Sequence, residues 1–180
     1  MKIAITGHTK GIGKAIADLY YTDEVVGFSS SNGYDLSDST TVDKIITSST
    51  NCDIFVNNAY HGTAQVDIFE KLLTHWNNDP TKTIVNINSR TIYNPPNQRQ
   101  YTADKKLLRG SAVTAIRDFN RKCRIININP GYVKTDMTSA VHEKYKMLAP
   151  EQLAAMIKWC LDQPQEIEVG ELSVWCTTLD

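Results

Sequence analysis

Short apolar runs alternate along the chain with longer segments in which apolar residues recur every three or four positions. The short runs have the length of buried β-strands, and the longer segments have the period of amphipathic helices. Strands are expected over Lys2–Thr6, Glu24–Phe28, Asp53–Asn57, Thr83–Asn88, Arg124–Ile128 and Glu171–Trp175. Helices are expected over Ile12–Tyr20, Ser37–Ser48, Gln65–Trp76, Arg99–Asn120 and Pro150–Leu161, with a Pro/Asn-rich loop at Tyr93–Asn97.

Strands that alternate with helices in this way indicate right-handed β-α-β units and a parallel sheet with helices on both faces. We therefore predict an α/β fold, a Rossmann-like doubly wound parallel sheet. No internal repeat or low-complexity linker divides the 180 residues, so a single domain over residues 1–180 is expected. Ligands of such sheets bind outside the carboxyl ends of the strands.

Charge and composition exclude several classes of partner. Nineteen basic and twenty acidic residues give a net charge of −1, which argues against binding to nucleic acid or an anionic membrane surface. No segment approaches the roughly 20 apolar residues that span a bilayer. The cysteines are scattered without a CxxC pair, so no metal site is expected, and they are predicted to be reduced. With no export signal, a cytoplasmic protein is expected.

A glycine-rich segment, Thr6–Gly13, joins the first expected strand to the first expected helix and reads TGHTKGIG. Glycines permit a tight turn and let the backbone approach a pyrophosphate closely. The helix that follows would direct its free N–H groups and positive dipole end at that anion. An ordinary strand–helix turn is the alternative. We predict phosphate binding by Gly7, Thr9, Lys10, Gly11, Ile12 and Gly13.

The end of the second strand indicates which dinucleotide is preferred. A site for NAD(H) places an acidic residue there to hold the ribose 2′-hydroxyl, whereas this chain has Ser29 and Ser30. Lys10 would pair with a 2′-phosphate, helped by the serine hydroxyls, unless it is only a solvated surface lysine. NADP(H) is therefore the predicted cofactor, and NAD(H) is the alternative.

Ser89, Tyr101 and Lys105 are the predicted catalytic residues. Tyr101 and Lys105 stand four residues apart on one helical face, and Ser89 ends the strand that precedes them. The lysine cation is expected to lower the pKa of the Tyr101 phenol, which would then act as acid or base. Ser89 would donate a hydrogen bond to the carbonyl oxygen of the substrate. A solvated Tyr/Lys pair on an exposed helix is the ordinary alternative.

The order of these motifs resembles that of the short-chain dehydrogenase/reductase family over nearly the whole chain. The spacing TGxxxGIG, the strand-terminal serine and the YxxxK pair are similar to the motifs of that family. The resemblance implies that the cofactor is also contacted by Asp35, Leu36, Asn57, Asn58, Ala59, Pro130, Gly131, Val133 and Thr135. It also implies a homodimer or homotetramer that pairs through the long helix near Arg99.

The chain departs from the family pattern at several points. It is much shorter than typical members, and the family asparagine that holds a relay water has no secure match; Gln65 lies roughly where it would fall. Tyr60 replaces the last glycine of the NNAG motif, which would narrow the cofactor edge or pack against a neighbour. The short loop after Met137 predicts a shallow, accessible substrate pocket, with His142, Tyr145 and Met147 as candidate border residues.

The leading functional hypothesis is an NADP(H)-dependent oxidoreductase that transfers hydride between the nicotinamide and a small carbonyl or alcohol substrate. The alternative is a non-catalytic NADP(H)-binding sensor or scaffold of the same fold. Sugar-nucleotide epimerisation is disfavoured, because the chain leaves little room for a second, substrate-binding domain.

Overall fold

The computed structural model describes residues 1–95 and 99–177. Six strands form one sheet: β1 (Lys2–Thr6), β2 (Glu24–Phe28), β3 (Ile54–Asn57), β4 (Thr83–Ile87), β5 (Arg124–Pro130) and β6 (Glu171–Val174). The α-helices are α1 (Gly11–Leu19), α2 (Thr41–Ser49), α3 (Ala64–Trp76), α4 (Gln100–Ile116) and α5 (Pro150–Leu161). Short 3-10 helices cover Ser30–Asn32, Arg90–Tyr93 and Asp136–Val141. Among the described residues, no helix is long and apolar enough to cross a membrane.

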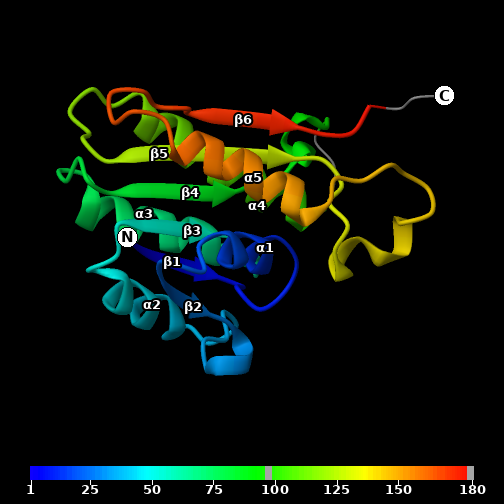
Figure 1. The fold of residues 1–180 in the computed structure, drawn as a ribbon, viewed down its shortest axis with the longest axis horizontal. Coiled ribbons are helices and arrows are strands. Elements are labelled where there is room, and N and C mark those ends of the chain that lie inside the picture. The colour runs from blue at the N-terminus through cyan, green and yellow to red at the C-terminus, as the bar shows by residue number, and fades with distance from the viewer. Residues whose placement is uncertain (96–98, 178–180) are drawn as a thin grey trace.

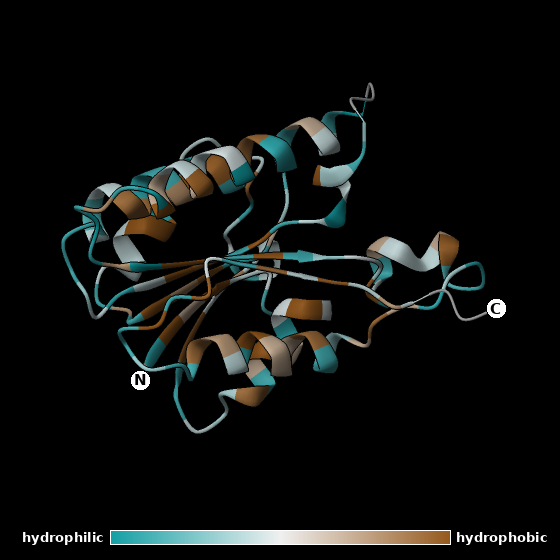
Figure 2. Cartoon of the chain, turned by 90° about the horizontal axis from the view of Figure 1, so that it is seen from above, coloured by the Kyte–Doolittle hydropathy of each residue, from teal (hydrophilic) through white to brown (hydrophobic). Residues whose placement is uncertain are grey.

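All neighbouring strands are parallel, in the order β2-β1-β3-β4-β5-β6 (Figure 1). Helices cover both faces of the sheet (Figure 2). Strand side chains alternate between the faces, so each face has its own apolar core. Ile3 and Val56 pack with α1 and α5 on one face, whereas Phe55 and Ile84 pack with α2, α3 and α4 on the other. The predicted Rossmann-like, doubly wound parallel sheet is confirmed.

The chain crosses from β1 outward to β2 and then returns to place β3 on the other side of β1. This reversal leaves a crevice between the carboxyl ends of β1 and β3, where parallel α/β sheets bind their ligands. The glycine-rich turn and the segment after β3 both open into this crevice. The topology therefore brings together motifs that are about fifty residues apart.

On the face that packs against α3 and α4, the strands change from apolar to polar near their carboxyl ends. Ile84 of β4 is fully buried in the core, and the next residue on that face, Asn86, aligns with Asn57 of β3 and Asn127 of β5. The Asn57 amide donates to the Asn86 side-chain oxygen over 3.0 Å. The sheet thus carries a buried row of asparagines just before the carboxyl ends of its strands.

Two helix boundaries differ from the prediction. The helix α2 begins at Thr41 and not at Ser37, because the Asp35 and Asp38 carboxylates accept hydrogen bonds from backbone N–H groups two residues on and form turns instead. The helix α4 ends at Ile116, because Asp118 forms a similar turn with the N–H of Asn120. In the predicted loop Tyr93–Asn97, residues 96 and 97 lie outside the described residues.

Candidate active site

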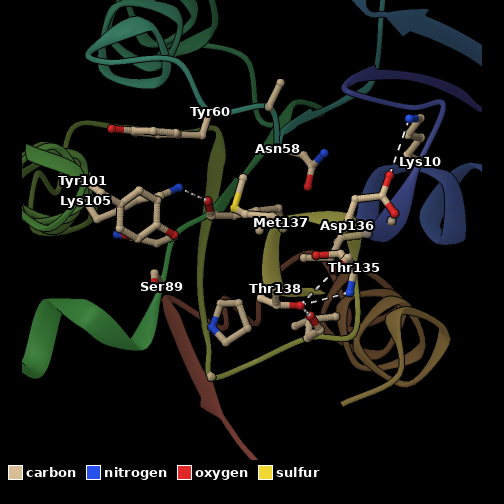
Figure 3. A pocket seen from close by; sticks show the side chains of 18 residues that line it. Lys10, Asn58, Tyr60, Ser89, Tyr101, Lys105, Thr135, Asp136, Met137 and Thr138 are labelled. Atoms are coloured by element: carbon tan, nitrogen blue, oxygen red, sulfur yellow. Dashed lines mark hydrogen bonds and ion pairs between the residues drawn. The ribbon is translucent and has the colours of Figure 1, made fainter. Parts of the chain in front are cut away.

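A cavity of about 260 Å³ opens at the carboxyl ends of β1, β3, β4 and β5 (Figure 3). Its walls bring together most of the predicted residues for the reacting end of a cofactor. They include Lys10, Gly11, Ile12, Asn58, Ala59, Ser89, Tyr101, Lys105, Pro130, Gly131, Val133 and Thr135. Residues from five separate segments of the chain therefore share one space.

The glycine turn is held closely against the segment that follows β3. Gly7 has a φ of 70°, and a Cβ at Gly13 would lie 2.2 Å from the Gly7 carbonyl oxygen. The Asn58 side chain donates to the Thr6 carbonyl over 2.9 Å, and the Thr6 hydroxyl accepts from the backbone N–H groups of Asn58 and Ala59. The turn has no room for a side chain at Gly7 or Gly13, so its backbone at these positions packs closely against its surroundings. Gly13 itself packs inside the turn and does not line the cavity.

A second cavity, of about 270 Å³, continues from the turn past the end of β2. It is lined by the residues predicted for the adenosine half of the cofactor: Gly7, Thr9, Lys10, Ser29, Ser30, Asp35, Leu36 and Ala59. The Ser29 hydroxyl is already bonded to Ser31 and Asn32, whereas Ser30 is exposed. Lys10 forms an exposed ion pair with Asp136, 3.4 Å away.

Ser89 and Tyr101 meet at the wall of the first cavity. Ser89 caps the short helix Arg90–Tyr93, where its hydroxyl accepts the Thr91 N–H, and it also hydrogen-bonds to the Tyr101 phenol. Burial raises the pKa of Tyr101 above its ordinary value, and the bond to Ser89 lowers it in part. Burial therefore outweighs the lowering that was expected from Lys105. Tyr101 is a protonated phenol at neutral pH.

Lys105 is buried beside these two residues. Its ammonium donates to the Gln65 side-chain oxygen over 2.5 Å and to the Ile87 carbonyl over 2.8 Å. It lies 5.6 Å from the centre of the Tyr101 ring. Burial lowers the pKa of Lys105 to about 7, which the nearby Asp104 carboxylate counteracts only in part. Lys105 therefore exchanges between its charged and neutral forms near physiological pH.

Gln65 hydrogen-bonds directly to Lys105. It lies roughly where the family pattern would place the relay asparagine, for which the sequence had no secure match. Its amide nitrogen donates to the carbonyls of Asn57 and Ile87, which turns its oxygen toward Lys105. The Asn57 side chain in turn donates to the Gln65 backbone carbonyl over 2.7 Å. Asn57 is fully buried and lines neither cavity, so the expected contact between Asn57 and a cofactor is wrong. It supports Gln65 instead.

Tyr60, the departure from the NNAG pattern, packs against Tyr101, the tyrosine predicted to be catalytic. The two rings are perpendicular with centroids 4.8 Å apart, and the Tyr60 hydroxyl donates to the buried Asp104 carboxylate over 2.8 Å. Gln100 donates to the other oxygen of that carboxylate. Burial raises the pKa of Tyr60 to about 12. Tyr60 therefore packs against the ring of Tyr101 and lines the cavity.

Asn88 is a wall residue that the sequence analysis missed. It is 2% exposed, and neither polar atom of its side chain has a partner among the described residues. Buried amides without partners are uncommon and mark a place for a ligand or an ordered water. The signal in the sequence was a polar residue at the end of an apolar strand, directly before Ser89.

The loop after β5 covers the crevice from the opposite side. A Cβ at Gly11 would lie 3.0 Å from the Thr135 methyl group, so this loop rests on the glycine turn. The Thr138 hydroxyl ties the loop to the Val133 and Thr135 carbonyls. Met137 is exposed and lines the cavity (Figure 3). Of the candidate border residues, His142 forms a hydrogen bond with the Thr138 hydroxyl through its ring nitrogen.

Comparison with known proteins relates part of the sequence to a known family and the whole fold to solved structures. The sequence model described as short chain dehydrogenase matches residues 63–146, a range that contains Ser89, Tyr101 and Lys105. No curated protein matches the sequence.

Solved structures with a similar fold include a serine dehydrogenase complexed with NADP+, with a TM-score of 0.80 and 17% identity, covering 100% of this chain and 96% of that one. A mutant 4-hydroxyisoleucine dehydrogenase complexed with NADH and succinate has a TM-score of 0.81 and 18% identity, and the match covers 97% of this chain and 96% of that one. A 3-ketoacyl-(acyl-carrier-protein) reductase from Brucella melitensis complexed with NADH has a TM-score of 0.76 and 21% identity, and the match covers 97% of this chain and 96% of that one.

Proposed function

We propose that this chain, which belongs to the short-chain dehydrogenase/reductase family, transfers hydride between a nicotinamide dinucleotide and a small carbonyl or alcohol substrate. The observation that carries the proposal is the convergence of Ser89, Tyr101 and Lys105 on the cavity that the glycine turn also lines. A packed surface pair would not place a phenol, a buried ammonium and a hydroxyl around one space.

The residues of the crevice fit a dinucleotide. A Cβ at Gly13 would strike the turn, so the turn depends on glycine there and keeps its backbone accessible to a pyrophosphate. Asn88 offers an unpaired buried amide in the half of the crevice that holds Tyr101. When bound, the nicotinamide supplies the hydride in reduction and accepts it in oxidation.

In reduction, Ser89 donates a hydrogen bond to the carbonyl oxygen and Tyr101 gives its proton to the same oxygen. The raised pKa of Tyr101 keeps this proton in place until the substrate arrives. As negative charge develops on the phenol oxygen, the Lys105 ammonium stabilises it. Oxidation runs through the same groups in reverse, with Tyr101 as the base.

Replacement of the phenol tests the catalytic role. Tyr101→Phe should lower turnover by about 10²- to 10⁴-fold, the usual contribution of a general acid, while cofactor binding is kept. Tyr21→Phe, at a tyrosine that is 83% exposed, is the matched control. The assay follows the oxidation of NADPH at 340 nm with a panel of aldehydes and ketones. Full activity of Tyr101→Phe would contradict the assignment.

The preferred cofactor is proposed to be NADP(H). Lys10 and Ser30 line the cavity beyond β2. The last residue of β2 is Phe28, so the carboxyl end of this strand carries no acidic residue. Lys10→Glu should weaken NADPH binding by about tenfold or more and leave NADH binding nearly unchanged, since a lysine–phosphate contact is charge-assisted. Titration by fluorescence quenching measures both. Tighter binding of NADH than of NADPH by the unmutated protein would contradict the preference.

A non-catalytic cofactor sensor is the second candidate. The direct contact between Gln65 and Lys105 favours it, because the side-chain amide occupies the place expected for the relay residue. Binding of NADPH without turnover of any carbonyl compound would support this alternative. Homo-oligomerisation and a cytoplasmic location stay predictions, and light scattering tests the first.

A further inference from the structure

A third cavity, of about 560 Å³, lies beyond Tyr101 on the side away from the glycine turn. It shares Tyr60, Ser89 and Tyr101 with the cofactor cavity, so a molecule inside it meets the hydroxyl groups that would act on a carbonyl. Its charged lining residues within the described part of the chain are Arg90 and Arg99, and none of its described lining residues is acidic. Arg90 therefore makes this space favourable to an anionic molecule.

Arg90 follows Ser89 directly in the chain. Its guanidinium lies 4.5 Å from the centre of the Trp175 ring, in a cation–π contact. Trp175 in turn packs edge-on against Tyr93, and a Cβ at Gly131 would lie 2.5 Å from the Trp175 Cβ. Arg90 has no carboxylate partner among the described residues. The stack holds the planar group on the cavity wall, and its N–H groups have no hydrogen-bond acceptor among the described residues.

We propose that Arg90 binds a carboxylate of the substrate while Ser89 and Tyr101 hold its carbonyl or hydroxyl oxygen. The substrate class is then a short oxo acid or hydroxy acid, an inference that rests on the proposed function for its reactive end. A guanidinium presents parallel N–H groups that match the two oxygens of a carboxylate. Because Arg90, Ser89 and Tyr101 line the same cavity, the carboxylate and the reacting carbon would belong to one small molecule.

A matched pair of substrates tests the charge preference: 3-oxobutanoate and its neutral methyl ester, with NADPH. The unmutated protein should show a kcat/KM about tenfold higher for the acid, the contribution expected of a charge-assisted hydrogen bond. Arg90→Met should abolish this preference and leave the ester within about twofold. Arg90→Lys should keep part of it, because it keeps the charge but loses the planar fork. Arg117→Met, at an exposed arginine outside these cavities, is the control for net charge.

Equal kcat/KM values for acid and ester, or an equal loss for both in Arg90→Met, would overturn the proposal while the oxidoreductase function stands. Binding of butanoate to the protein–NADPH complex, measured by calorimetry, tests the site without turnover. Arg90→Met should weaken this binding by about tenfold. Unchanged binding overturns the carboxylate site, and so does tighter binding of propylphosphonate than of butanoate. Arg90-dependent butanoate binding without turnover of either ester or acid would support the site and refute the proposed function.

Discussion

Removal of the Gln65 oxygen should move the pH dependence of the reaction. Gln65 accepts a hydrogen bond from Lys105 over 2.5 Å in a buried site, and the pKa of Lys105 is already lowered to about 7. A hydrogen bond to a charged group contributes about 1.5–3 kcal/mol, and one pKa unit corresponds to about 1.4 kcal/mol. Gln65→Leu should therefore lower the pKa of Lys105 by a further one to two units, approximately.

The sign follows from the role of the ammonium. In the proposed mechanism, reduction requires a protonated Tyr101 and a charged Lys105, so kcat/KM should fall as the pH rises through the pKa of Lys105. In the unmutated protein this fall should lie near pH 7. In Gln65→Leu it should shift to about pH 5–6, which lowers kcat/KM at pH 7 by about tenfold. Gln65→Glu places a carboxylate beside the ammonium and should shift the fall above about pH 8.

The assay is kcat/KM for carbonyl reduction from pH 5 to 9.5, with Gln165→Leu, at an exposed glutamine outside the cavities, as the control. A merely structural role for Gln65 would reduce activity by the same factor at every pH. Identical midpoints in the unmutated protein, Gln65→Leu and Gln65→Glu would refute the reasoning.

Three other substitutions give measurable outcomes. Lys105→Met should raise the free energy of unfolding at pH 7, because the pKa of Lys105 is lowered in the folded state. The difference in this free energy between the variant and the unmutated protein should shrink between pH 7 and 10.5. Urea unfolding that shows the same difference at every pH would contradict this. Gly13→Ala places a Cβ against the Gly7 carbonyl and should weaken NADPH binding by about tenfold and stability by about 1–3 kcal/mol, measured by fluorescence titration and thermal melting. Tyr60→Phe removes a hydrogen bond to Asp104 and should cost about 1–2 kcal/mol in urea unfolding, with cofactor binding unchanged; full stability would show that this bond contributes nothing.

Local patterns were enough to predict the elements and the motifs. The strand Lys2–Thr6 was placed correctly because an apolar run next to a glycine turn has few alternative conformations. The spacing of Tyr101 and Lys105 predicted one helical face because the helical period is fixed by backbone geometry. The boundaries failed where short side chains competed for the backbone, as at Asp38.

The tertiary structure decided the environment of each group. Lys105 meets Gln65, forty positions earlier, only because α3 and α4 pack side by side on one face of the sheet. The pKa of Tyr101 rises where the sequence predicted a fall, since desolvation depends on every element packed around the ring and not on the neighbour four residues away. Arg90 likewise acquires its place from Trp175, at the far edge of the sheet. The sequence by itself determined which chemical groups are present and their local spacing, whereas burial and long-range contacts, which arise only on packing, determined their charge and their partners.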